Sequence, residues 1–184
     1  MFQKLLKKIA QELDKVDIQY MVIGGQAILL YGEPRLTKDI DITLGVGIDK
    51  FKEVKNVAGK LKLKILVSKA EEFVKNTMVL PVVDEKSGIR VDLIFSFSPY
   101  ERQAIERANR VKFGSTIVKF ASIEDVVIHK IVAGRARDIE DIKSIILKNS
   151  NYDIKYITKQ LKEFDNLLNK NFLNIFRKLA KEIK

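Results

Sequence analysis

An α+β core followed by a C-terminal helical subdomain is the fold that this sequence predicts. Up to about residue 121, short apolar or alternating segments typical of strands are separated by segments with helical apolar spacing. From residue 122 the spacing of apolar residues is helical almost to the end of the chain. We therefore expect a core over residues 1–121 and a helical subdomain over residues 122–184.

The elements of the core follow from local spacing. Leu5, Ile9 and Leu13 recur every four residues and predict an amphipathic helix, whereas the apolar run that ends at Gly24-Gly25 predicts a buried strand. Pro34 and turns rich in glycine and charged residues separate the later elements. In order, the expected core elements are helix 2–15, strand 20–23, helix 26–31, strand 39–44, helix 49–61, strand 62–67, helix 70–76, strands 78–83 and 89–97, helix 99–109 and two short strands within 111–120.

The helical subdomain is predicted to begin at a cap. Ser122, with Asp125 three residues later, resembles a capping box in which aspartate replaces the usual glutamate or glutamine. The expected helices that follow are 123–133, 138–148, 153–163 and 166–181.

Composition excludes several classes of protein. The 184 residues include no cysteine, which excludes a disulfide scaffold, a cysteine zinc site and a thiol nucleophile. With 46% hydrophobic and 32% charged residues, the chain has the composition of a globular protein. Its start lacks the pattern of a signal peptide, and no charge-free run reaches the length of a membrane span. We therefore expect a cytoplasmic protein that has no membrane partner.

The positive charge is concentrated near the end of the chain. The formal net charge is +10, and residues 143–184 carry 10 basic against 4 acidic residues. A basic helical region of this kind attracts phosphate-rich partners such as RNA. The alternative interpretation is a lysine-rich helical face that is solvated and binds nothing.

Two aspartates on one predicted strand are the first candidate site. Asp39 and Asp41 are two residues apart, so their side chains point to the same face, while Ile40 and Ile42 anchor the other face in the core. Neighbouring carboxylates repel each other unless they share a proton or a cation, and Mg²⁺ is the usual cation for such a pair. The alternative is an amphipathic strand whose acidic residues simply face water.

Two further features extend the candidate site. Two glycines before a helix, Gly24 and Gly25, let backbone amides approach a phosphate closely, although they also suit a tight turn. Asp92 is a single acidic residue in the centre of another alternating strand, where a charge costs free energy unless it is paired or binds a ligand. Three aspartates on two strands beside a glycine turn are what two-metal phosphoryl or nucleotidyl transfer requires.

The pattern of Gly24-Gly25, then Asp39-Ile40-Asp41-Ile42, then Asp92 resembles the polymerase-beta-like nucleotidyltransferase superfamily. Within it, Arg35-x-Thr37-x-Asp39 and the segment 129–141 are similar to the branch that includes the nucleotidyltransferases of abortive-infection, or type IV toxin–antitoxin, systems. That branch has a Lys-x-x-Ala helix followed closely by Arg-Asp-x-x-Asp. The resemblance implies the nucleotidyltransferase fold, a mixed β-sheet flanked by helices.

The resemblance also implies roles for individual residues. Asp39 and Asp41 would hold two Mg²⁺ ions, and Asp92 would complete the metal site and help to deprotonate an acceptor hydroxyl. Gly24 and Gly25 would bind the triphosphate of a nucleoside triphosphate through their backbone N–H groups. The acceptor hydroxyl would attack the α-phosphate, and pyrophosphate would leave.

Residues near these motifs form a second group of candidates. The resemblance implies that Lys130 neutralises the charge of the β- and γ-phosphates. Arg35 is a candidate phosphate clamp or a counter-charge for the aspartates. We expect Thr37 to steady the loop before Asp39.

A second cluster follows Lys130. A continuous helix would align Lys130, Gly134, Arg137 and Asp141 in one stripe. Alternatively, Gly134 ends one helix and another starts near Asp138, which would turn the cluster toward the cleft. Arg137, Asp138 and Asp141 are candidate site residues, although ordinary helical ion pairs have the same spacing.

The sequence leaves the acceptor and the partners open. One hypothesis is Mg²⁺-dependent transfer to RNA, for example to a tRNA end that docks on the basic C-terminal helices. A second is the same chemistry on a protein side chain or a small molecule, because the catalytic motif does not select the acceptor. A third is a catalytically silent module that binds nucleotide or RNA, or one component of a toxin–antitoxin pair with an antitoxin partner.

Overall fold

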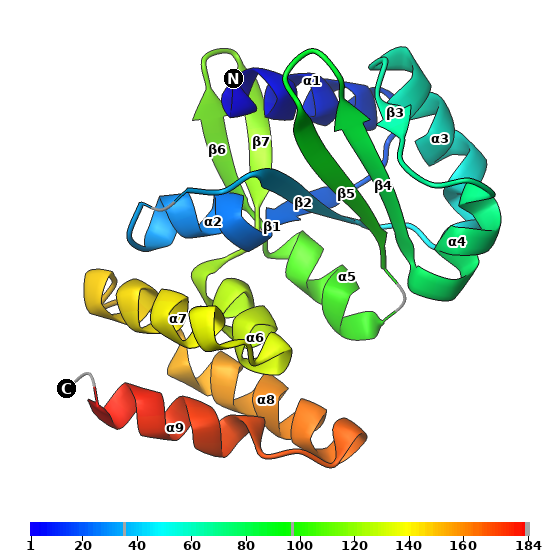
Figure 1. Ribbon diagram of the computed structural model, residues 1–184. Coiled ribbons are helices and arrows are strands. Elements are labelled where there is room, and N and C mark those ends of the chain that lie inside the picture. The colour runs from blue at the N-terminus through cyan, green and yellow to red at the C-terminus, as the bar shows by residue number, and fades with distance from the viewer. Residues whose placement is uncertain (35, 97, 183–184) are drawn as a thin grey trace. The chain divides into compact units, whose positions relative to one another are not determined.

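A computed structural model of the chain describes residues 1–34, 36–96 and 98–182 (Figure 1). The helices are α1 (Phe2–Lys15), α2 (Gly24–Tyr31), α3 (Phe51–Lys60), α4 (Ala70–Thr77), α5 (Pro99–Glu106), α6 (Ile123–Ala133), α7 (Ala136–Lys148), α8 (Ile154–Leu168) and α9 (Phe172–Glu182), with a 3-10 turn η1 (Ile48–Lys50). The strands are β1 (Tyr20–Ile23), β2 (Asp39–Leu44), β3 (Lys64–Ile65), β4 (Val79–Asp84), β5 (Ile89–Phe95), β6 (Asn109–Phe113) and β7 (Thr116–Phe120).

The α+β prediction is confirmed. Within the described residues the strands form one seven-stranded mixed sheet in the order β3-β4-β5-β2-β1-β7-β6. Strand β2 runs parallel to β5 and β1 runs parallel to β7, and the other neighbours are antiparallel. Strands β1 and β2 are therefore interior strands of the sheet, each paired on both sides.

The two faces of β2 differ in character. Ile40 and Ile42 are almost completely buried, whereas Asp39 is exposed and Asp41 is half-buried. Helix α1 covers the apolar face, because Gln11 Nε2 donates to Thr116 Oγ1 at 3.0 Å and the register places Thr116 on the same side as Ile42. The alternation of apolar and acidic residues thus presents both aspartates on the opposite face of the sheet.

Several predicted boundaries are wrong, each for a local reason. Helix 26–31 already begins at Gly24, which follows directly on β1. The expected strand 62–67 is reduced to Lys64–Ile65, which pairs with Val82 and Val83 of β4, and Leu66 adds one backbone hydrogen bond to the carbonyl of Pro81. Helix 99–109 ends at Glu106, because Asn109–Phe113 pairs with β7 as a strand.

The last helices are also shifted from the prediction. Helix 138–148 begins two residues earlier, and helix 153–163 continues to Leu168, where Asn169 ends it in the left-handed conformation with φ +52°. Helix 166–181 begins only at Phe172. The Asp165 carboxylate explains this start, since it accepts hydrogen bonds from the backbone N–H groups of Phe172 and Leu173 at 2.5 and 3.2 Å.

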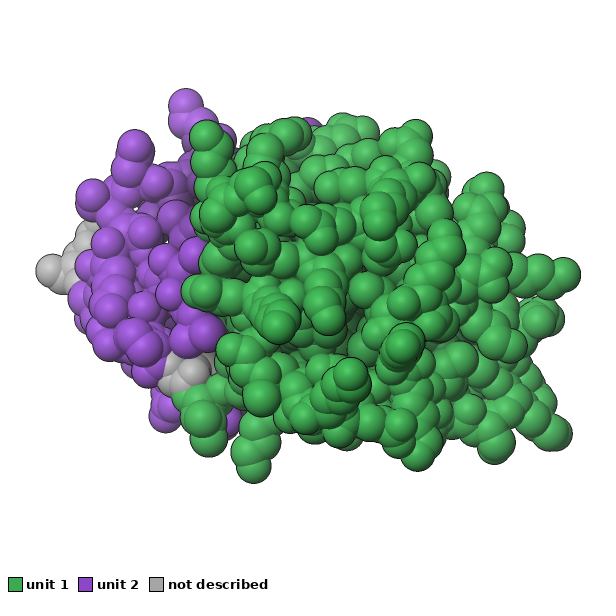
Figure 2. All heavy atoms as spheres, turned by 90° about the horizontal axis from the view of Figure 1, so that it is seen from above, with its two compact units in different colours: residues 1–26, 36–121 green, residues 27–35, 122–184 purple. Residues whose placement is uncertain are grey.

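The chain divides into two compact units (Figure 2). Unit 1 contains Met1–Gln26 and Leu36–Ala121, and therefore the whole sheet. Unit 2 contains Ala27–Arg35 and Ser122–Lys184. The division after Ala121 coincides with the predicted start of the helical subdomain, but segment 27–35 groups with the helices. The boundary between the units therefore runs through α2.

Unit 2 holds segment 27–35 through hydrogen bonds from α7 and its C-cap. Asn149 Nδ2 donates to the carbonyl of Tyr31 at 2.7 Å, and Lys148 Nζ donates to the carbonyl of Gly32 at 3.2 Å. The predicted cap at Ser122 is present, because its Oγ accepts from the backbone N–H of Asp125 at 3.1 Å. Among the described residues, the helices are all too short or too polar to cross a membrane.

Candidate active site

Strand pairing brings Asp41 and Asp92 together. In the parallel register of β2 and β5, Asp41 lies directly opposite Asp92 and Asp39 lies opposite Arg90. Directly paired residues of neighbouring strands point to the same face of a sheet. All three predicted aspartates therefore lie on one face, with Asp39 two positions before Asp41 on the same strand.

The start of α2 lies against the Asp41 carboxylate. Strand β1 pairs with β2 so that Ile23 lies opposite Asp41, and the next residue, Gly24, begins the helix with φ +62°. A Cβ atom on Gly24 would lie 1.9 Å from Asp41 Oδ2, which is far inside any contact distance. Glycine is required here for two reasons, the positive φ and the close approach of the carboxylate.

The helix N-terminus adds a positive field to this corner of the sheet. Helix α2 begins with Gly24 and Gly25, and the first backbone N–H groups of a helix have no partner within the helix. These groups and the helix dipole favour an anion. The two glycines that the sequence predicts to bind phosphate therefore adjoin one of the predicted metal ligands.

Two polar side chains hold Asp39 in place. Thr37 Oγ1 donates to Asp39 Oδ1 at 3.2 Å and lies 3.3 Å from the Asp39 carbonyl oxygen. Gln26 Nε2 donates to the same carbonyl at 3.3 Å. Thr37 steadies the loop before Asp39, as expected, but Gln26 was not among the sequence candidates. The sequence feature that could have identified Gln26 is its position, because it is an amide side chain directly after the Gly-Gly pair, on the first turn of α2.

Asp92 has an electrostatic environment that favours a proton or a cation. Its Oδ1 atom is buried and has no hydrogen-bond partner among the described residues. Burial raises the pKa of Asp92 above its ordinary value, the Arg90 guanidinium opposes this effect, and the charge of Asp39 adds to it. A buried carboxylate oxygen without a donor is what a metal ion or a substrate proton would satisfy.

The donor chemistry of the three aspartates fits Mg²⁺, which prefers carboxylate oxygens. The partnerless oxygen of Asp92, on the strand next to Asp41, is the observation that supports this fit. Within the described part of the chain, no group of three acidic or histidine side chains is already gathered closely enough to hold a metal ion. The aspartates therefore share a face without forming a closed cage.

The predicted second cluster lies inside unit 2. Lys130 is buried on α6, and its Nζ lies 2.7 Å from Asp138 Oδ1 and 2.7 Å from Asp141 Oδ2, both on α7. Arg135 Nε pairs with Asp138 Oδ2 at 2.8 Å, and the backbone N–H of Arg135 donates to the same oxygen at 3.2 Å. Arg137 is exposed. The structure thus brings Lys130, Asp138 and Asp141 into one buried ion-pair network.

A break at Gly134 creates this network. Gly134 ends α6 in the left-handed conformation with φ +63°, and α7 begins at Ala136. Of the two alternatives, the break at Gly134 is therefore confirmed, whereas the continuous helix and the stripe that would align Lys130 with Gly134 and Arg137 are wrong. The turn instead folds α7 back so that its carboxylates meet Lys130. The predicted contact of Lys130 with a nucleotide stays a prediction, and Arg35 lies outside the described residues.

Removing the Lys130 ammonium should destabilise unit 2 strongly. Lys130→Met would leave two buried carboxylates without their shared cation, and breaking a buried ion pair in this way costs about 3–5 kcal/mol. Urea unfolding of the wild type and the variant measures the loss. Lys143→Met is the matched control, because Lys143 forms an exposed ion pair with Glu182 that contributes at most about 1 kcal/mol. Equal losses in the two variants would contradict the structural role of Lys130.

The stability of unit 2 should also depend on the ionisation of Asp138. Burial would raise the pKa of Asp138, but hydrogen bonds from Lys130 and Arg135 outweigh it and hold the pKa below the ordinary value of an aspartate. Because the folded pKa is lower than the unfolded one, the stabilisation is complete above the unfolded value and is lost as the pH falls through the folded value. The difference in urea midpoint between wild type and Asp138→Asn should therefore shrink as the pH falls below the ordinary pKa of an aspartate. A difference that stays constant with pH would contradict this assignment.

Comparison with known proteins gives a family for this arrangement. Residues 1–181 match the family model described as "Nucleotidyltransferase of unknown function (DUF6036)". No curated protein matches the chain.

Several solved structures share the fold. The chain is similar to an antigenic nucleotidyltransferase-like protein from Paracoccidioides brasiliensis, with 20% identity and a TM-score of 0.54 over 89% of this chain and 87% of that one. It is similar to ANT(2'')-Ia in complex with adenylyl-2''-tobramycin, with 14% identity and a TM-score of 0.59 over 90% and 98% of the two chains. A nucleotidyltransferase-like protein from Thermotoga maritima has 15% identity and a TM-score of 0.52 over 77% and 90%. At such identities the likeness shows the nucleotidyltransferase fold alone.

Proposed function

Because this chain belongs to the family of nucleotidyltransferases of unknown function DUF6036, we propose that it is a nucleotidyltransferase enzyme. It would transfer a nucleoside monophosphate from a nucleoside triphosphate to an acceptor hydroxyl. The observation that carries the proposal is the pairing of Asp41 with Asp92, whose buried oxygen has no partner within the described residues, beside the start of α2 at Gly24. Carboxylates next to an anion-binding helix N-terminus suit a metal-bound triphosphate.

Magnesium is the proposed cofactor. Asp39, Asp41 and Asp92 would hold two Mg²⁺ ions, which when bound neutralise phosphate charge and activate the acceptor oxygen. The Thr37 hydroxyl and the Gln26 amide contribute indirectly, because they fix the conformation of Asp39 before any ion arrives.

The chain itself supplies phosphate binding and proton transfer. The backbone N–H groups at Gly24 and Gly25 bind the triphosphate, and the absence of a side chain at position 24 leaves room for Asp41 beside them. Asp92 helps to deprotonate the acceptor hydroxyl, and its buried Oδ1 atom, which has no partner among the described residues, is available to accept the proton. The acceptor oxygen then attacks the α-phosphate and pyrophosphate leaves.

For the acceptor we propose RNA. The formal net charge of +10 supports a polyanionic partner. Small molecules are the competing acceptor class, since similar folds occur in the lincosamide antibiotic adenylyltransferase LnuA and in ANT(2'')-Ia. The likeness of segment 129–141 to the abortive-infection branch supports an antitoxin as a further partner.

A labelling experiment tests the reaction. The protein is incubated with Mg²⁺ and each nucleoside triphosphate labelled on its α-phosphate, together with total RNA, a protein lysate or buffer alone. We expect label on RNA, lost when a chelator removes Mg²⁺. Label should also be lost in Asp41→Asn. Asp49→Asn serves as its matched control, because Asp49 is an exposed acid outside the aspartate cluster and its loss should leave transfer unchanged.

Each outcome of this experiment has a distinct meaning. Label on protein or on a small molecule would replace RNA as the acceptor and keep the reaction. Nucleotide binding without transfer to any acceptor would support a catalytically silent module. Transfer that continues in the chelator would contradict the magnesium site.

A further inference from the structure

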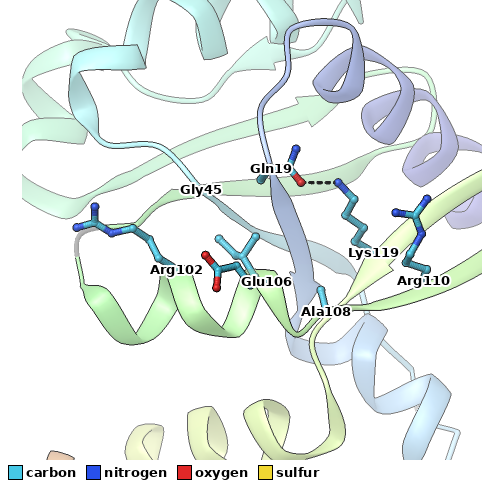
Figure 3. Close-up of a pocket in the computed structure, with 8 residues that line it drawn as sticks. Gln19, Gly45, Arg102, Glu106, Ala108, Arg110 and Lys119 are labelled. Carbon is cyan, nitrogen blue, oxygen red and sulfur yellow. Dashed lines mark hydrogen bonds between the residues drawn. The ribbon is translucent and has the colours of Figure 1, made fainter.

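Unit 1 contains a hollow of about 310 Å³ that shares no residue with the aspartate cluster (Figure 3). Its lining comes from several parts of unit 1: Gln19 before β1, Gly45 after β2, helix α5, Ala108 between α5 and β6, and strands β6 and β7. Three of the lining side chains are cationic, namely Arg102, Arg110 and Lys119, and one is acidic, Glu106. The hollow therefore carries an excess of positive charge.

The two arginines are available to a ligand. Arg102 on α5 and Arg110 on β6 are both exposed, and within the described residues neither has a carboxylate at ion-pair distance. Figure 3 shows them coming from opposite sides of the hollow. A guanidinium is a planar fork of N–H donors that matches two oxygens of a phosphate. Two guanidinium groups that line one hollow are therefore suited to bind a phosphate group.

Lys119 is the fixed cation of the hollow. Only 16% of its side chain is exposed, and its Nζ donates to Gln19 Oε1 at 2.7 Å and lies 5.4 Å from the centre of the Tyr20 ring. The nearest carboxylate oxygen, on Asp14, is 3.8 Å away. A neutral amide, an aromatic ring and a carboxylate near the outer limit of an ion pair thus hold the ammonium at a fixed position in the hollow.

The positive charge continues from the hollow along the sheet edge. Strand β6 is the last strand of the sheet, and Arg110 and Lys112 alternate on it with both side chains exposed. Charged residues on an edge strand also prevent pairing with other chains. That role does not explain Arg102, which comes from a helix and converges on the same hollow. A row of cations leading away from a hollow fits a chain of phosphates rather than a single anion.

The hollow lies within reach of the reaction centre. Gly45 is four residues beyond Asp41 along β2, a distance of about 13 Å at about 3.3 Å per residue. An extended nucleic acid strand with its acceptor hydroxyl at Asp92 could therefore place a nearby phosphate in the hollow.

We propose that the hollow formed by Arg102, Arg110 and Lys119 binds a backbone phosphate of a single-stranded RNA acceptor. The proposal rests on the proposed function for its choice of acceptor, and it places the contact on unit 1 rather than on the basic C-terminal helices. The two arginines grip the phosphate oxygens, Lys119 adds a fixed charge, and Lys112 contacts the neighbouring phosphate.

RNA binding without catalysis tests the proposal. Fluorescence anisotropy of a short labelled single-stranded RNA is measured with the full-length protein in a chelator, without nucleotide, over a series of salt concentrations. We expect Arg102→Gln with Arg110→Gln to weaken binding at least tenfold and to reduce the salt slope by about 0.7, the value for one lost phosphate contact. The matched control is Arg177→Gln with Lys178→Gln, which removes the same charge from exposed positions on α9 and should change the affinity less than twofold.

The outcomes separate the two proposals. Equal weakening of RNA binding in both double variants would mean that only net charge matters. Weakening in the α9 variant alone would place RNA on the C-terminal helices. Either result would overturn the proposal that the hollow binds RNA. A loss of ATP binding in the Arg102 and Arg110 variant with unchanged RNA binding would assign the hollow to the nucleotide and also overturns it. Because the assay needs neither Mg²⁺ nor turnover, a failure of transfer in the labelling experiment leaves this result intact.

Discussion

Replacing Asp41 by asparagine should lower nucleotidyl transfer by about 10³-fold or more, the scale of loss when a catalytic group is removed. Asp41 is opposite Asp92 in the β2–β5 register and against the first residue of α2, so it is the carboxylate that links the proposed metal site to the phosphate site. An amide is neutral and a much weaker ligand for Mg²⁺ than a carboxylate. Label transfer from the α-phosphate at saturating Mg²⁺ measures the effect.

The fold of the Asp41→Asn protein should be unaffected. The substitution removes one of several neighbouring negative charges, so the metal-free variant should be as stable as the wild type or more stable. Thermal unfolding in a chelator checks this. Transfer at the wild-type rate in a folded Asp41→Asn protein would refute the proposed site.

Adding a single methyl group at Gly24 should abolish transfer almost as completely. The new Cβ in Gly24→Ala would lie 1.9 Å from Asp41 Oδ2, so either the carboxylate or the start of α2 must move. A shift of about 1 Å in a catalytic group can cost about 10²-fold in rate. We therefore expect a loss of at least this size, with weaker nucleotide binding, measured by label transfer and by titration with the nucleotide.

A second glycine separates the clash from backbone strain. Gly88, in the turn between β4 and β5, has φ +69° and nothing within 4 Å of the position of a Cβ, whereas Gly24 has φ +62° and Asp41 at that position. Gly88→Ala therefore introduces the same left-handed strain of about 1–2 kcal/mol without a clash. It should lower stability and leave transfer intact. Equal losses of transfer in the two variants would mean that strain, and not the contact with Asp41, explains the need for glycine at position 24.

Much of the local structure was predictable because it depends on short-range periodicity. The strict alternation of Asp39–Leu44 predicted both the bounds of β2 and the common face of its two aspartates, and helix 123–133 was predicted with its cap at Ser122. Strand 62–67 was predicted too long, because its backbone pairing with β4 is limited to Lys64, Ile65 and one hydrogen bond from Leu66. A strand needs hydrogen bonds from another part of the chain, and sequence spacing does not report whether they exist.

The candidate site was only partly predictable for the same reason. The identities of Asp39, Asp41, Asp92 and the Gly24-Gly25 pair were available from motif and spacing. The meeting of Asp41 with Asp92 depends on the register of two strands that are 51 positions apart, and a shift of one residue would have turned one carboxylate to the other face. Gln26 was missed because its contact with the Asp39 carbonyl exists only once α2 has folded against β2.

By itself the sequence determined the α+β class, the glycine–aspartate motif and the excess of basic residues, since these follow from residue identity and local period. The tertiary structure decided what the charged residues contact. The turn at Gly134 places Lys130 within ion-pair distance of both Asp138 and Asp141. Packing of α5 and β6 places Arg102 and Arg110 in the lining of one hollow. The physical reason is that side-chain energies depend on distances of a few ångströms, and residues far apart along the chain acquire such distances only through packing and register.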